Sequence, residues 1–162
     1  TRFSRSTIIL MGSSCLLACN AVASENETRK DPAAAQISEN GLRQVPLTIT
    51  SKEKEHRLTV EVAQSTEEQS RGLMFRTKLS PNGGMIFPFG ADRMASFWMK
   101  NTVIPLDIIF VRRNGSVESI AANTIPYSLD PVQSGEPVGA VLEIAGGRAA
   151  ELGITAGDIV RW

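Results

Sequence analysis

The sequence predicts a β-rich α+β fold: a single compact domain of short strands, barrel-like or sandwich-like, with two small helices. Most apolar residues fall in short alternating or continuous runs rich in Val, Ile and Phe, which is typical of strands. Only two stretches carry helix signals, and both are short. These patterns occupy residues 42–162, a length that suits one hydrophobic core rather than two domains.

The beginning of this domain predicts a hairpin followed by a helix. Residues 45–50 and 56–62 alternate between apolar and polar side chains, and the charged segment 51–55 predicts the turn between them. The segment 66–69 (Thr-Glu-Glu-Gln) has the form of a capping box, with acids in the first turn. We therefore expect a helix over about residues 67–74.

The remainder of the domain predicts further short strands and the second helix. The expected strands cover residues 85–89, 95–99, 106–111, 116–121, 140–144 and 159–162. Pro88 is expected to end the first of them, and the Asn114-Gly115 pair predicts a hairpin turn. Residues 125–137 read as a loop, and 147–152 as a helix that Gly153 ends.

The N-terminal 23 residues predict an export signal or a lipoprotein leader. Two arginines precede the uncharged apolar stretch 7–18, which is too short to span a membrane and suits the core of a signal peptide. Two cleavages fit. The segment 21–23 (Ala-Val-Ala) suits ordinary export, whereas residues 16–19 resemble a lipobox in which Cys19 would be lipidated.

Residues 24–41 are polar, Ala-rich and free of aromatic side chains, so we expect a flexible linker between the leader and the domain. The predicted location is therefore outside the cytoplasm: periplasmic, or tethered to the membrane as a lipoprotein. In this interpretation the only contact with the membrane is the lipid anchor.

The charge balance argues against nucleic acid as a partner. The chain has 17 Lys and Arg residues and 17 Asp and Glu residues, so its formal net charge is zero. No basic block is present, although neutralisation of phosphates supplies most of the affinity for nucleic acid.

Several chemistries lack the residues they need. Both cysteines, Cys15 and Cys19, lie in the leader, and His56 is the only histidine, so Cys/His zinc sites and nucleophilic triads are disfavoured. No phosphate-binding Gly-rich loop is present. The sequence therefore predicts no cofactor and no metal. The region 74–99 contains four methionines whose thioethers could suit Cu(I), although core packing explains them more simply.

The candidate site is a set of charged residues beside apolar runs. Asp107 interrupts the run 106–111, and Glu143 interrupts 140–144. A buried acid needs a partner or acquires a raised pKa, and Arg71 and Lys100 are natural partners. The predicted ligand-binding residues are Arg71, Phe97, Trp98, Lys100, Asn101, Asp107 and Glu143.

Two interpretations of this set remain open. In the first, the residues form a structural network of ion pairs and hydrogen bonds, in which Asp107 caps the turn over 100–105. In the second, they line a polar pocket floored by Phe97 and Trp98. Glu143 could also simply face solvent across an alternating strand.

Several blocks of this sequence, in this order, resemble the DUF192 (UPF0127) family of small bacterial and archaeal domains. These blocks are Arg71–Arg76 (RGLMFR), Gly84–Phe87 (GMIF), Phe97–Phe110 (FWMKNTVIPLDIIF), Val141–Glu143 (VLE) and Gly157–Asp158 (GD). The resemblance covers residues 58–162. It implies a small β-rich fold, often exported or tethered to the membrane, with no cofactor and no established activity.

We therefore expect a small ligand-binding or accessory module of the cell envelope, whose partner is a small molecule or an envelope protein. Arg71 and Lys100 would attract an anionic group that Asp107, Glu143 and Asn101 hydrogen-bond. One alternative is an envelope hydrolase or lyase that uses Asp107 or Glu143 as general acid or base, which would require paired carboxylates whose pKa values are pushed apart. Another is a structural protein-interaction domain with an exposed apolar patch.

Overall fold

The computed structural model describes residues 36–162, which form ten strands and two short helices, as the predicted β-rich α+β class requires. The elements are β1 (Gln36–Ile37), β2 (Arg43–Ser51), β3 (Lys54–Val62), α1 (Thr66–Arg71), β4 (Gly83–Arg93), β5 (Ser96–Phe97), β6 (Leu106–Val111), β7 (Val117–Ala121), β8 (Val132–Gln133), β9 (Val138–Ala145), α2 (Arg148–Leu152) and β10 (Ile159–Arg161). The predicted leader, with Cys19, and the predicted linker up to residue 35 lie outside the described residues. Within residues 36–162, no helix is long and apolar enough to cross a membrane.

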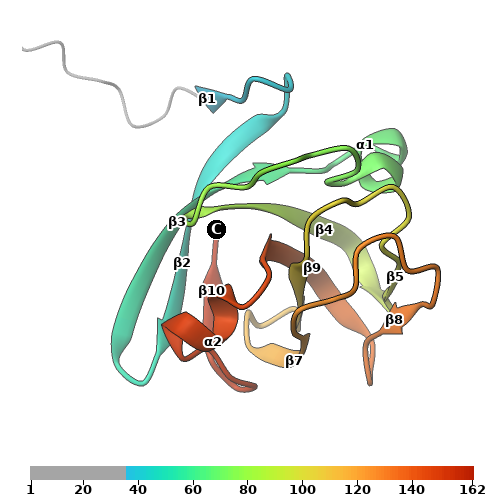
Figure 1. The fold of residues 1–162 in the computed structure, drawn as a ribbon. Coiled ribbons are helices and arrows are strands. Elements are labelled where there is room, and N and C mark those ends of the chain that lie inside the picture. Colours follow the sequence, from blue (N-terminus) through green and yellow to red (C-terminus); the bar gives the residue numbers. More distant parts are fainter. Residues whose placement is uncertain (1–35) are drawn as a thin grey trace, which may run out of the picture. The chain divides into compact units, whose positions relative to one another are not determined.

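The main sheet curls into a barrel. Its strands are ordered β1-β2-β3-β4-β9-β6-β7. β1 pairs with the start of β2, and β10 pairs with the end of β2, beside which it lies in Figure 1. A bridge between Ser116 and Ile159 then joins the β6–β7 hairpin to β10. The N–H of Val160 donates to the carbonyl of Gly115 at 2.8 Å across this join. Of the two predicted shapes, the structure has the barrel.

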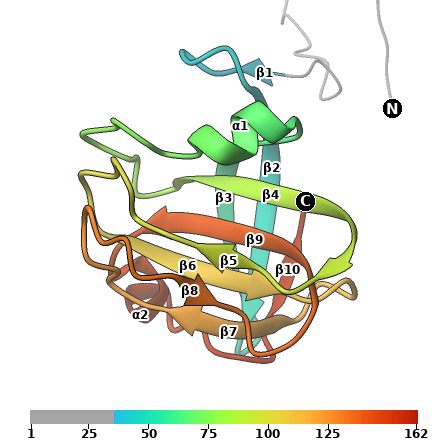
Figure 2. The same cartoon turned by 90° about the vertical axis from the view of Figure 1, so that its right-hand side faces the viewer.

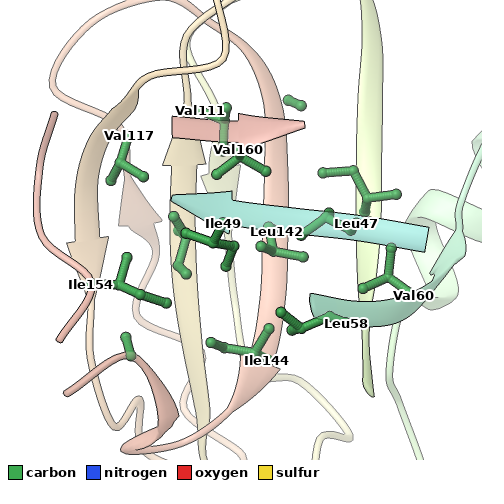
Figure 3. Close-up of a cluster of buried hydrophobic side chains, with 14 of the residues drawn as sticks. Leu47, Ile49, Leu58, Val60, Val111, Val117, Leu142, Ile144, Ile154 and Val160 are labelled. Atoms are coloured by element: carbon green, nitrogen blue, oxygen red, sulfur yellow. The ribbon is translucent and has the colours of Figure 1, made fainter. Parts of the chain in front are cut away.

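A first hydrophobic core fills the inside of the barrel. In Figure 3 the side chains of Ile49, Leu142 and Val160, from β2, β9 and β10, point toward one another. All three are fully buried. The alternating apolar residues of β2 and β3 that predicted a hairpin supply the same core, because successive side chains of a strand point to opposite faces.

A second core lies on the outer face of β4, β9 and β6. The small β5–β8 ladder covers this face (Figure 2), where Phe87, Phe110 and Val141 are buried. The middle strands are therefore buried on both sides, and all six residues of β6 are buried. That explains why the run 106–111 is apolar throughout except at Asp107.

Three predicted boundaries were wrong. Pro88 does not end its strand: β4 continues to Arg93, and the irregularity falls between these two residues. The segment 125–137 contains the short strand β8. The first helix ends at Arg71, because Gly72 has a φ of 48°, which glycine adopts readily and a helix does not contain.

The capping box of α1 is shifted by one residue from the predicted position. Ser65 is the N-cap, its hydroxyl accepts from the Glu68 N–H, and the Glu68 carboxylate accepts from the Ser65 N–H. The same carboxylate accepts from the N–H of Gln64, and these backbone hydrogen bonds lower the pKa of Glu68. The box fixes the start of the helix that carries Arg71.

Ser65→Ala should lower the free energy of unfolding by about 1 kcal/mol, because the N–H of Glu68 loses its acceptor. Urea unfolding of the full chain measures this difference. Ser70→Ala serves as the control, since its hydroxyl donates to the carbonyl of Thr66, four residues back, and caps no orphan N–H group. Equal stabilities of the two variants would contradict the assigned cap.

Candidate functional site

A cleft of about 310 Å³ opens between α1, β4, β5 and the middle of β9. It is lined by Thr66, Gln69, Ser70, Arg71, Gly72, Leu73, Met74, Phe87, Arg93, Ser96, Phe97, Trp98, Thr102 and Glu143. Four of the seven predicted site residues are among them. Two larger hollows lie nearby, but the buried acid that lines one of them, Glu61, is already paired with Arg76 at 2.6 Å.

Glu143 is a nearly buried acid in the wall of the cleft. It lies on β9 opposite Met85 of β4 and Ile108 of β6, and only 5 % of it is exposed. Among the described residues, no group donates a hydrogen bond to its carboxyl and no cation pairs with it. Loss of hydration raises the pKa of Glu143 to about 8. The solvent-facing alternative for this residue was therefore wrong.

Two guanidinium groups lie at the mouth of the cleft. Arg71 is exposed on the last turn of α1, and Arg93 is exposed at the end of β4. Gln69 orients Arg93: its amide donates to the carbonyls of Ala63 and Pro88, and its oxygen accepts from Arg93 at 3.4 Å. Within residues 36–162 neither arginine pairs with a carboxylate, so both charges remain available to a ligand.

Aromatic rings form the apolar side of the cleft. Phe87 and Phe97 pack edge to face, with their ring centroids 5.1 Å apart. Trp98 is about half exposed, and the ammonium of Lys100 lies 5.0 Å from the centroid of its ring. Trp98 is therefore part of the mouth rather than the floor predicted for it. Lys100 is exposed and does not line the cleft.

Asp107 belongs to the architecture of the barrel end. Its carboxylate is fully buried and accepts from three backbone N–H groups: those of Asn123 at 2.8 Å, Gly147 at 2.9 Å and Ala149 at 2.7 Å. It thereby joins β6 to the loop after β7 and to the start of α2. The structural interpretation of Asp107 fits, although its partners differ from the predicted turn over 100–105.

Asp107 and Glu143 face opposite sides of the sheet. Ile108 is the cross-strand partner of Glu143, whereas Asp107 is opposite Ile144. Because neighbouring residues of a strand point to opposite faces, the two acids lie on different sides of β6 and β9. They cannot act together on one substrate, so the geometry contradicts a paired acid and base.

The loops beside the cleft have unusual backbone conformations. Phe75 and Tyr127 have φ values of 64° and 62°, and both side chains are exposed. Bulky residues rarely adopt positive φ, and such strain gathers at functional sites. Asn101 also has a positive φ, of 57°, and its carbonyl accepts from the N–H of Phe75 at 2.8 Å. Asn101 therefore supports the backbone at Phe75 and does not line the cleft.

Arg93, Gln69 and Thr102 line the cleft but were not predicted from the sequence. Arg93 lies beyond Pro88, where we expected the strand to have ended, and nothing in the local pattern distinguishes it. His56, on β3, does not line the cleft. The described part of the chain contains no group of three or more His, Cys, Asp or Glu side chains that could hold a metal ion.

Comparison with known proteins shows the family of this chain, and the similar solved structures include the two described below. The DUF192 family model, described as Uncharacterized ACR, matches residues 47–162. A protein of unknown function from Novosphingobium aromaticivorans is 50% identical, over 80% of this chain and 94% of that chain, with a TM-score of 0.78. A putative transcription regulator from Sinorhizobium meliloti is 36% identical, over 74% of this chain and 94% of that chain, with a TM-score of 0.73. The search of curated proteins yields no match.

Proposed function

This chain belongs to the DUF192 family, and from its cleft we propose that it is a small-ligand-binding module of the cell envelope. The ligand has an anionic group that meets the guanidinium groups of Arg71 and Arg93. Its apolar part packs against Phe97 and Trp98. The location in the envelope is supported by the leader predicted over residues 1–23, which suits either ordinary export or lipidation at Cys19.

The observation that carries this proposal is the state of Glu143. A carboxyl that is 5 % exposed and without a hydrogen-bond partner among the described residues reduces the stability of the fold once it ionises. A residue of this kind is expected where function opposes stability. Glu143 also lines a cleft that has free cations at its mouth, which is the combination found in sites for polar ligands.

The catalytic alternative has less support. A hydrolase or lyase that uses Asp107 and Glu143 as a pair needs both acids on one wall of one cleft. Asp107 is fully buried and its oxygens already accept three backbone N–H groups. We therefore propose binding rather than turnover.

Two other roles remain alternatives. A protein-interaction domain is favoured by the exposed apolar side chains of Phe75, Ile125, Tyr127 and Leu129 beside the cleft. Binding of DNA is suggested by the relative from Sinorhizobium meliloti, named as a putative transcription regulator. The zero net charge and the absence of a basic block argue against it.

The test is a titration of the full chain with 3-phenylpropionate and phenyl phosphate, which join an aromatic ring to an anion. We expect amide chemical-shift changes at α1, β5 and β9, and Arg71→Gln should weaken binding about tenfold through loss of a charge-assisted hydrogen bond. Arg57→Gln is the control, because Arg57 is exposed on β3 and pairs only with Glu55. The proposal fails if neither probe shifts these amides.

A further inference from the structure

The buried and the exposed parts of the cleft favour groups of opposite charge. Glu143 is nearly buried in the wall of the cleft, while Arg71 and Arg93 are exposed at its mouth. From this arrangement we propose that the ligand is a zwitterion of amino-acid size, whose primary ammonium meets Glu143 and whose carboxylate meets the two arginines. This inference rests on the proposed binding function and specifies the class of ligand.

The surroundings of Glu143 suit an ammonium group. Its oxygens accept no hydrogen bond from any residue in the range 36–162, whereas an ammonium brings three donors. The ring of Phe97 and the indole of Trp98 line the same cleft, and the faces of aromatic rings attract cations. A carboxylate beside aromatic rings is thus a cation site that the protein itself leaves unfilled.

The arginines and the size of the cleft define the rest of the ligand. Guanidinium groups bind carboxylates through two parallel hydrogen bonds. A volume of about 310 Å³ is at the lower end of small-molecule sites, which limits the ligand to about the size of one amino acid. The apolar side of the cleft, formed by Phe87, Phe97 and Trp98, favours an apolar or aromatic side chain.

Binding of an ammonium is distinguished from binding of a plain anion by the protons that are exchanged. Unliganded Glu143 has a pKa of about 8, so about nine-tenths of it is protonated at pH 7. An ammonium requires the ionised form and releases that proton, whereas an anion favours the neutral carboxyl and releases none. Among the residues that line the cleft, Arg71 and Arg93 are the only other charged groups. Across the sheet, β4 and β6 present Met85 and Ile108 to Glu143.

The experiment is calorimetry of the full chain with three matched probes. These are L-phenylalanine, 3-phenylpropionate, which lacks the ammonium, and 2-phenylethylamine, which lacks the carboxylate. Repeating each titration at pH 7 in buffers of different ionisation enthalpy counts the protons released. Glu143→Gln keeps the shape and the neutral charge of the protonated acid, and Arg71→Gln removes one cation from the mouth.

We expect L-phenylalanine to bind with release of about 0.9 proton at pH 7, and about tenfold more tightly at pH 7 than at pH 6. Glu143→Gln should abolish the proton release and weaken the binding of L-phenylalanine and 2-phenylethylamine at least tenfold. The binding of 3-phenylpropionate should be unaffected. Arg71→Gln should weaken the binding of L-phenylalanine and 3-phenylpropionate, the two probes with a carboxylate, and leave the binding of 2-phenylethylamine unaffected.

Two failures are distinguishable. If 3-phenylpropionate binds while L-phenylalanine binds no better and releases no proton, the ammonium assignment is wrong and the binding function stands. If none of the three probes binds, the ligand class is wrong, and if phenyl phosphate also shifts no amide of the cleft, the proposed function is wrong as well. Tight binding of L-phenylalanine that Glu143→Gln leaves unchanged would also overturn the assignment.

Discussion

Asp107→Asn should lower the free energy of unfolding of the full chain by about 3 kcal/mol. The carboxylate accepts three backbone N–H groups in a site without solvent. An asparagine retains one acceptor oxygen and turns an NH₂ group toward N–H donors, so at least one buried N–H loses its acceptor. Urea unfolding monitored by tryptophan fluorescence measures the difference.

The control for this variant is an acid of the same type in an exposed pair. Asp92 binds Arg113 at 2.5 Å, with 44% of its side chain exposed, so Asp92→Asn should change stability by less than about 1 kcal/mol. If Asp107→Asn were as stable as the parent, the hydrogen bonds to Asn123, Gly147 and Ala149 would not be what holds α2 and the loop after β7 to β6.

Substitution of Asp107 is not expected to affect the cleft directly. It faces the interior of the barrel, away from Glu143, and reaches no residue that lines the cleft. The presence of a single acid inside the apolar run Leu106–Val111 is therefore explained by its role in the barrel, not by the cleft. Ligand binding in a folded Asp107→Asn chain should stay close to that of the parent.

Local patterns in the sequence were sufficient for most of the fold. Alternation in β2 and β3 and the Asn114-Gly115 turn identify hairpins without tertiary information, because they depend on the two-residue period of strands and on turn conformation. The extent of β4 beyond Pro88 was missed. Nothing in the local sequence reveals that the strand resumes its pairing with β9 at Arg93.

The candidate site was only half predictable, because its geometry depends on register between distant strands. The sequence identified Asp107 and Glu143 as unusual acids, and it could not show that Ile108, rather than Asp107, is opposite Glu143. A shift of one residue in this pairing would have placed the two acids on one face. Arg93 and Gln69 line the cleft together because α1 packs on β4, which the local sequence does not reveal.

Glu143→Gln should have the opposite effect to Asp107→Asn and raise the free energy of unfolding at pH 7 by about 3 kcal/mol. The pKa of Glu143 rises from 4.5 to about 8 on folding, because burial disfavours the charged carboxylate. At pH 7 the folded protein therefore holds a proton that the unfolded chain has lost. Glutamine keeps the shape of the neutral acid without this penalty.

Because the pKa of Glu143 is raised on folding, the stability difference between Glu143→Gln and the parent depends on pH. Below pH 4.5 the acid is neutral in both states, so Glu143→Gln and the parent should have equal stability. As the pH rises from 4.5 toward 8, the unfolded state of the parent gains from ionisation and the folded state does not. The difference between variant and parent should grow across this window and become constant above it.

Glu61→Gln separates this explanation from a general effect of removing buried acids. Glu61 is as buried as Glu143, but its carboxylate pairs with Arg76 at 2.6 Å and accepts from Asn40. Removing one partner of a buried ion pair destabilises the folded protein. Glu61→Gln should therefore lower the free energy of unfolding at pH 7, whereas Glu143→Gln raises it. If both variants lost stability at pH 7, Glu143 would be contributing to the fold. If only Glu143→Gln gained, the fold would be keeping an acid that opposes its own stability, which is the condition that a binding site for a cationic group requires.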